Sequence, residues 1–89
     1  MTELSEVGIF DKNLKSLSTE ELIIILKNMY ESASYGYKVT MIHLFGIEYA
    51  NKLKNKSLKN ISYAATGRFS FATEISKGIK LSEFVKKND

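Results

Sequence analysis

The chain has 89 residues, a formal net charge of +3 and neither cysteine nor proline. This length suits one small domain, and a hydrophobic fraction of 44% is typical of a globular protein and too high for a disordered one. Without cysteine, disulfides, thiolate metal sites and a cysteine nucleophile are excluded. The longest apolar run, residues 22–26, is far too short for a membrane span. No secretory leader pattern is seen at the start, so we expect a cytoplasmic protein.

Residues 1–17 lack sustained hydrophobic periodicity. We therefore expect an N-terminal arm over this range and a single helical domain over 18–89. Four apolar residues of the arm could tie it to the domain: Ile9, Phe10, Leu14 and Leu17.

The first predicted helix begins at Ser18 and fades near Ala33. Ser18 followed three residues later by Glu21 is the capping-box pattern, in which each side chain bonds the other residue's backbone N–H. Apolar residues then recur at helical spacing and predict a core face: Leu22, Ile25, Leu26, Met29 and Tyr30.

The second predicted helix runs from Val39 or Thr40 to Asn55. One face carries most of its large apolar residues: Ile42, Phe45, Tyr49 and Leu53. Gly46 and Ala50 lie on the same face, so another helix could approach closely there.

Five apolar residues of these two helices lie beside or outside the predicted core faces: Ile23, Ile24, Met41, Leu44 and Ile47. A chain of this length has little core in which to bury them. The surplus predicts a homodimer seam or a docking face for a protein partner. The alternative is that the N-terminal arm covers it.

The third predicted helix follows Ser57 as N-cap, carries Leu58, Ile61 and Ala65 on one side, and ends at Gly67 in a left-handed conformation. The fourth begins after Ser70, its predicted N-cap. We expect Ala72 and Ile75 to face the core, Phe71 and Glu74 to point outward, and Gly78 to end the helix.

A last short helix is predicted over 81–87, with Leu81, Phe84 and Val85 docking on the domain. No stretch alternates with a period of two residues. The fold class is therefore all-α, a compact four- to five-helix domain with a helix-turn-helix-like C-terminal half.

Charge is divided unevenly along the chain. Residues 1–50 carry four lysines against seven acidic residues, a net charge of −3, and residues 51–89 carry nine basic residues against three acidic ones, a net charge of +6. A basic surface attracts polyanions by releasing their counterions, and nucleic acid is the commonest of them. The alternative is that the lysines keep a small protein soluble.

The predicted corner over 64–81 offers candidates for contact with duplex DNA. In a helix-turn-helix the second helix presents residues near its N-terminus to the major groove. The residues that would then face DNA are Arg68, Ser70, Thr73, Lys77 and Lys80. Glu74 argues against this interpretation, because it places a negative charge where phosphates would lie. Two short helices joined by a glycine also occur as ordinary helical corners.

Catalysis and cofactor binding find little support in the sequence. His43 is the single histidine and has no nucleophile or carboxylate at a recognisable motif spacing. No His/Cys cluster or glycine-rich phosphate loop occurs, so we expect no enzyme, no metal and no cofactor. Of Phe69 and Phe71, we expect one to fill the core and the other to pack against a neighbour.

The segments MIHLFGIEYA (41–50) and FATEISKGIKLSEFV (71–85) resemble a small bacterial family of helix-turn-helix-like domains. The resemblance covers residues 20–85 and implies a helical fold and, by analogy, contact with DNA. The sequence thus favours a small dimeric DNA-binding regulator or accessory protein. The alternative is a protein-interaction module, an adaptor or an inhibitor of a larger enzyme, for example in phage–host defence.

Overall fold

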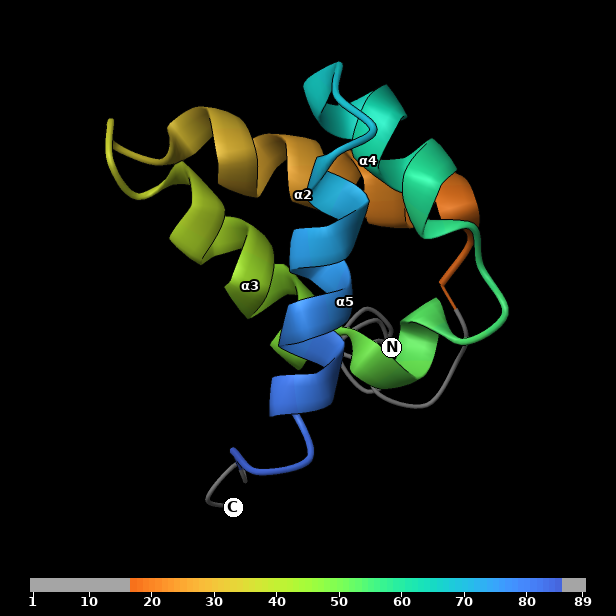
Figure 1. The fold of residues 1–89 in the computed structure, drawn as a ribbon. Coiled ribbons are helices and arrows are strands. Elements are labelled where there is room, and N and C mark those ends of the chain that lie inside the picture. The colour runs from red at the N-terminus through yellow and green to blue at the C-terminus, as the bar shows by residue number, and fades with distance from the viewer. Residues whose placement is uncertain (1–16, 86–89) are drawn as a thin grey trace, which may run out of the picture.

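Four α-helices and one 3₁₀ turn make up the part of the chain that the computed structural model describes, residues 17–85 (Figure 1). They are α2 (Thr19–Ser32), α3 (Lys38–Glu48), η1 (Ala50–Leu53), α4 (Leu58–Thr66) and α5 (Phe71–Leu81). The predicted all-α fold class is confirmed. Within the described range, every helix is too short or too polar to cross a bilayer. The predicted arm lies outside the described residues except for Leu17, which packs against the core.

Helix α2 begins and ends where the sequence predicts. The Ser18 hydroxyl accepts a bond from the Glu21 backbone N–H at 3.1 Å, and the Glu21 carboxylate accepts one from the Ser18 N–H at 2.8 Å. Two backbone donors at the helix start are thereby satisfied. The helix ends at Ser32, and Ala33 takes an extended conformation.

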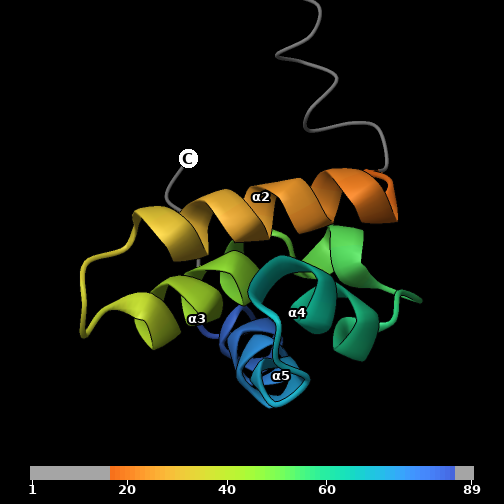
Figure 2. The ribbon, with the colours of Figure 1, turned by 90° about the horizontal axis from the view of Figure 1, so that it is seen from above.

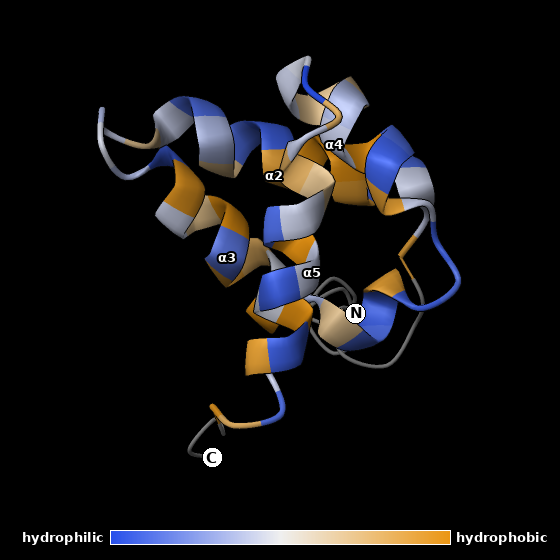
Figure 3. Cartoon of the chain, in the orientation of Figure 1, coloured by the Kyte–Doolittle hydropathy of each residue, from blue (hydrophilic) through white to orange (hydrophobic). Residues whose placement is uncertain are grey.

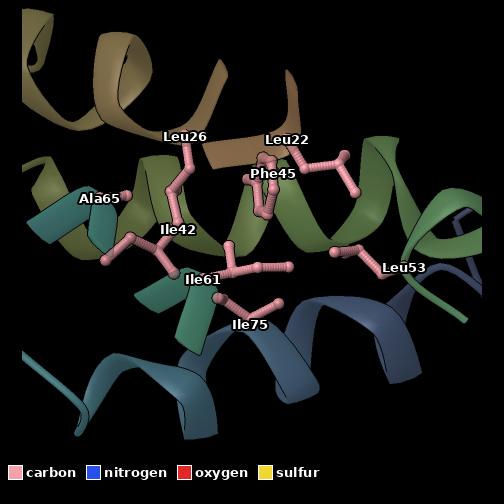
Figure 4. Packing of buried hydrophobic residues seen from close by; sticks show 8 residues of the cluster. All are labelled: Leu22, Leu26, Ile42, Phe45, Leu53, Ile61, Ala65 and Ile75. Carbon is pink, nitrogen blue, oxygen red and sulfur yellow. The ribbon is translucent and has the colours of Figure 1, made fainter. Parts of the chain in front are cut away.

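Every element contributes to one hydrophobic core. Figure 2 shows α2 crossing above α3 and α4, with α5 on the far side of the molecule from α2. Figure 4 shows the side chains that meet between them: Leu22, Leu26, Ile42, Phe45, Leu53, Ile61, Ala65 and Ile75. Full burial of a large apolar side chain is worth about 1.5–3 kcal/mol, so this cluster is the main source of stability.

A pair of glycines fixes how α5 crosses α3. A Cβ atom built on Gly46 would lie 2.5 Å from the carbonyl oxygen of Ile75 and 2.9 Å from the Cα of Gly78. A Cβ built on Gly78 would lie 2.9 Å from the Cα of Gly46. These distances are far below van der Waals contact, so the two backbones can approach this closely only because neither residue has a side chain.

The prediction that Gly78 ends its helix is therefore wrong. Helix α5 continues through Gly78 to Leu81, and the N–H of Ser82 still donates to the Gly78 carbonyl at 3.0 Å. Gly78 lies in the middle of α5, where the absence of a side chain allows α3 to approach closely. At Gly46 the predicted close approach is present, whereas Ala50 lies beyond the end of α3, in η1.

Two other predicted boundaries are also wrong. Helix α3 ends at Glu48, because Tyr49 leaves helical dihedral angles (φ −110°, ψ 22°), and the tighter η1 turn then carries Leu53 into the core. The separate last helix over 81–87 is absent from the described residues. The three residues expected to dock are instead exposed: Leu81, Phe84 and Val85.

The glycine crossing predicts an unusual response to alanine. Gly→Ala inside a helix normally stabilises it by about 1 kcal/mol. We expect Gly78→Ala instead to lower the free energy of unfolding by at least about 2 kcal/mol, because the new methyl group meets rigid backbone. Chemical denaturation measures the change. The control is Gly67→Ala, where φ is +84° but nothing lies within 4 Å, and only strain of about 1–2 kcal/mol is expected. A Gly78→Ala variant as stable as the wild type would contradict the crossing.

Candidate nucleic-acid interface

A four-residue connection, residues 67–70, joins α4 to α5. Gly67 ends α4 with φ 84°, and its N–H donates to the Tyr63 carbonyl at 2.8 Å. This is the left-handed cap that the sequence predicts. The two helices and their glycine-containing turn have the form of a helix-turn-helix unit.

Side chains of α4 hold the backbone of Arg68 in place. The hydroxyl of Ser62, which is fully buried, donates to the Arg68 carbonyl. Thr66 Oγ1 accepts from the Arg68 N–H at 3.2 Å and donates to the Ser62 carbonyl at 2.8 Å. Arg68 itself is exposed, so a fixed backbone presents a guanidinium group that is able to make bidentate contacts.

Three of the other predicted contact residues follow along α5. Thr73, Lys77 and Lys80 are exposed and recur at intervals of four and three residues, so they share one face of the helix. The opposite face carries Ile75 and Gly78, both buried. Because the glycine crossing fixes the rotation of α5 about its axis, it also fixes the outward direction of this face.

Ser70 is exposed at the start of α5, but it does not cap the helix as predicted. Its backbone is in the right-handed helical region (φ −65°, ψ −23°) and its side chain makes no capping hydrogen bond. A capping side chain normally requires an extended backbone at that position. The hydroxyl of Ser70 therefore makes no hydrogen bond to the backbone at the start of α5.

Glu74 does not point freely outward, as the sequence suggests. Its Oε1 lies 2.6 Å from Nε2 of His43 on α3, and its Oε2 lies 3.6 Å from Nζ of Lys77. An ionised carboxylate can only accept a hydrogen bond, so Nε2 of His43 carries the proton. The hydrogen bond from His43 is the main reason that the pKa of Glu74 is lowered, and Lys77 adds to the effect.

The carboxylate of Glu74 is thus engaged within the protein, by a hydrogen bond from His43 and by the nearby positive charge of Lys77. The objection that this carboxylate would repel phosphates is weakened accordingly. Over residues 58–81 the chain carries four basic side chains and one acidic one. Figure 3 shows a further hydrophilic segment in the loop between η1 and α4, where Lys54 and Lys56 lie.

The two phenylalanines beside Ser70 have different roles. Phe71 packs against the core and its ring lies 5.6 Å from that of Tyr30, so its predicted outward position is wrong. Phe69 is 52% exposed and stacks on Tyr63 with ring centroids 4.4 Å apart. Ala72, predicted to face the core, is only partly buried, because Phe71, Ile75 and Gly78 occupy the inner face of α5.

The five predicted interface residues differ in exposure. Ile24 on α2 and Leu44 on α3 are exposed, at 58% and 45%. Ile23 packs against the core, and Met41 and Ile47 are partly buried. The surplus apolar surface is therefore concentrated in two of the five residues.

Sequence reasoning missed the bond between His43 and Glu74 and the buried role of Ser62. The two bonded residues are 31 positions apart, and no local pattern joins them. The positions of these two residues relative to Gly46 and Gly78 are nevertheless a signal in the sequence. His43 precedes Gly46 by three residues and Glu74 precedes Gly78 by four, so each lies one helical turn from the glycine at which α3 and α5 cross.

A comparison with known protein families agrees with the helix-turn-helix form of α4, the turn and α5. Residues 18–88 match the family of HTH-like domains, and the chain belongs to that family. Neither the curated proteins nor the solved structures contain a significant match.

The lowered pKa of Glu74 predicts a pH dependence of stability. A carboxyl whose pKa falls on folding stabilises the folded state above its ordinary pKa, and this contribution is lost as pH falls through the folded value. We expect Glu74→Gln to lower the unfolding temperature at neutral pH, and the difference from wild type to shrink as pH drops below 4.5, the ordinary value. Thermal unfolding followed by circular dichroism from pH 7 to 2.5 measures it, with the exposed Glu83→Gln as control. A difference independent of pH would contradict the hydrogen bond.

Proposed function

We propose that this protein is a small DNA-binding regulator or accessory protein that contacts duplex DNA through the outer face of α5 and the turn before it. The main observation behind the proposal is that α5 has two different faces. Its inner face is buried and held against α3 at Gly78, and its outer face exposes Thr73, Lys77 and Lys80. Membership of the HTH-like family supports the same type of function.

The residues of the proposed DNA-binding surface make different kinds of contact with DNA. Arg68, held by its backbone at the turn, reaches a guanine edge or a phosphate. Ser70 and Thr73, near the start of α5, offer hydroxyl groups to the DNA backbone or to base edges. Lys77 and Lys80 contact phosphates further along the helix. We propose that the protein binds DNA rather than catalysing a reaction, and that it is located in the cytoplasm.

A second part of the proposal is that the protein is a homodimer. Ile24 and Leu44 are large apolar side chains that remain exposed in the single chain, and such residues favour protein contacts. The same two exposed side chains support the alternative function, a protein-interaction module that acts as an adaptor or as an inhibitor of a larger enzyme. Phage–host defence is one setting in which such a module would act. That alternative predicts no affinity for duplex DNA even at low salt.

Phosphate binding by Lys80 is tested by a matched pair of lysine variants. Lys80→Ala should weaken binding to all duplexes and make the slope of log K against log salt shallower by about 0.9, the value for one neutralised phosphate. Fluorescence anisotropy with a random-sequence duplex measures both. Lys27→Ala is the control: it removes the same charge from an exposed site on α2, on the opposite side of the molecule from α5 (Figure 2). Equal effects of the two variants would reject the proposed face.

The homodimer is tested by placing a charge at Leu44. Because Leu44 is 45% exposed, Leu44→Glu should leave the fold intact and shift the wild-type dimer to a monomer. Sedimentation equilibrium gives the mass and circular dichroism the fold. Asn28→Glu, the same residue introduced at another exposed site, should remain dimeric. A wild-type protein that is monomeric at all concentrations would contradict the dimer.

A further inference from the structure

Two aromatic side chains form a stacked pair on the surface where α4 meets the turn before α5. The rings of Tyr63, on α4, and Phe69, in the turn, are nearly parallel, with an interplanar angle of 15° and centroids 4.4 Å apart. Each of the two residues is nevertheless 52% exposed. In a stack of two rings each ring covers only one face of the other, so the pair can extend the stack to a further flat ring.

The backbone that carries the pair is ordered by hydrogen bonds. The carbonyl of Tyr63 accepts a bond from the N–H of Gly67 at 2.8 Å, and the hydroxyl of the buried Ser62 donates to the carbonyl of Arg68, the residue before Phe69. The two rings are therefore presented by backbone that is already fixed. Less conformational entropy is lost when a ligand binds to such a preformed surface.

Exposed positive charges lie next to the pair along the chain. Lys59 precedes Tyr63 by four residues on α4, so the two lie one turn apart on the same face of the helix, and Arg68 is the neighbour of Phe69. Over residues 53–73 the chain carries four basic side chains and no acidic one. None of the four makes an ion pair within the part of the chain that the structure describes.

These features fit one kind of ligand, an unpaired nucleotide. Its base is a flat ring that stacks on aromatic side chains, and its phosphate carries the negative charge that the cations attract. An aromatic side chain of a protein partner would supply the ring without the charge. A base inside a duplex has both of its faces covered by its neighbours, so it cannot stack on the pair.

We propose that Tyr63 and Phe69 form a stacking platform for an unpaired base, with the adjoining phosphates toward Lys59 and Arg68. The proposal rests on the proposed DNA-binding function and adds to it the form of DNA that is recognised, a duplex continued by a single strand. Phe69 lies between Arg68 and Ser70, two of the proposed duplex contacts. A strand that leaves the duplex at the start of α5 therefore meets the platform directly.

The test compares the binding of three DNA duplexes that share one sequence. The first has blunt ends, the second has a short overhang of unpaired thymidines, and the third has an abasic overhang that keeps the phosphates but lacks the bases. Fluorescence anisotropy at one fixed low salt concentration gives each Kd, because phosphate contacts depend strongly on salt. We expect the thymidine overhang to bind about tenfold more tightly than the abasic one, as stacking of a base predicts.

Three variants separate the ring from the rest of the surface. Phe69→Leu keeps an apolar side chain but removes the ring, and should abolish the gain from the thymidine bases. Phe69→Tyr keeps a ring and should retain the gain. Tyr35→Leu is the control: it removes a ring that is 98% exposed in the turn between α2 and α3, away from the turn between α4 and α5 in both views (Figures 1 and 2). Circular dichroism confirms that each variant is folded.

Three outcomes would overturn the proposal. Equal affinities for the thymidine and abasic overhangs would show that the base makes no contact. A loss in Phe69→Leu that is the same for all three duplexes would show that the ring only supports the turn. A wild-type dimer that Phe69→Leu dissociates, measured by sedimentation equilibrium, would show that the pair packs against a second copy instead.

The same measurements separate this proposal from the proposed function. If the blunt duplex binds and the thymidine overhang adds nothing, the platform is rejected and the duplex-binding function stands. If a free oligo(dT) strand binds through Phe69 and the blunt duplex does not bind, the duplex-binding function is rejected and the platform stands. Absence of binding to every one of these DNAs would reject both.

Discussion

The contact between Gly46 and Gly78 is the constraint on which the rest of this structure depends. It lets the backbones of α3 and α5 approach until a Cβ on either residue would collide with the other helix. That approach brings His43 within 2.6 Å of Glu74 and places Ile75 in the core. It also determines which side of α5 faces outward, and therefore where Thr73, Lys77 and Lys80 lie.

The crossing also changes the electrostatics of the candidate interface. In the sequence Glu74 is a lone negative charge among basic residues. In the fold it accepts a hydrogen bond from His43 and lies near Lys77, and its pKa is lowered as a result. A residue that argues against DNA contact in the sequence thereby becomes a structural link between α3 and α5. The basic character of the surface then depends on Arg68 and Lys80 together with the lysines before α4.

Short sequence patterns predict much of the fold, because each pattern acts on backbone groups only a few residues away. The capping box at Ser18 and the left-handed glycine at position 67 depend on backbone groups within a few residues. The prediction at Gly78 is wrong because a glycine that stops a helix and one that admits a neighbouring helix look the same in sequence. The bond between His43 and Glu74 depends on how α3 and α5 cross, which no single segment specifies.

Mapping the duplex-binding surface by NMR tests most directly whether the outer face of α5 contacts DNA. In a titration of the ¹⁵N-labelled protein with a short duplex at low salt, we expect amide shift changes over residues 68–80 and none in α2. The largest changes are expected at Arg68, Ser70, Thr73, Lys77 and Lys80. Shift changes centred on α2 and Leu44, or none at all, would contradict the claim that the outer face of α5 binds DNA.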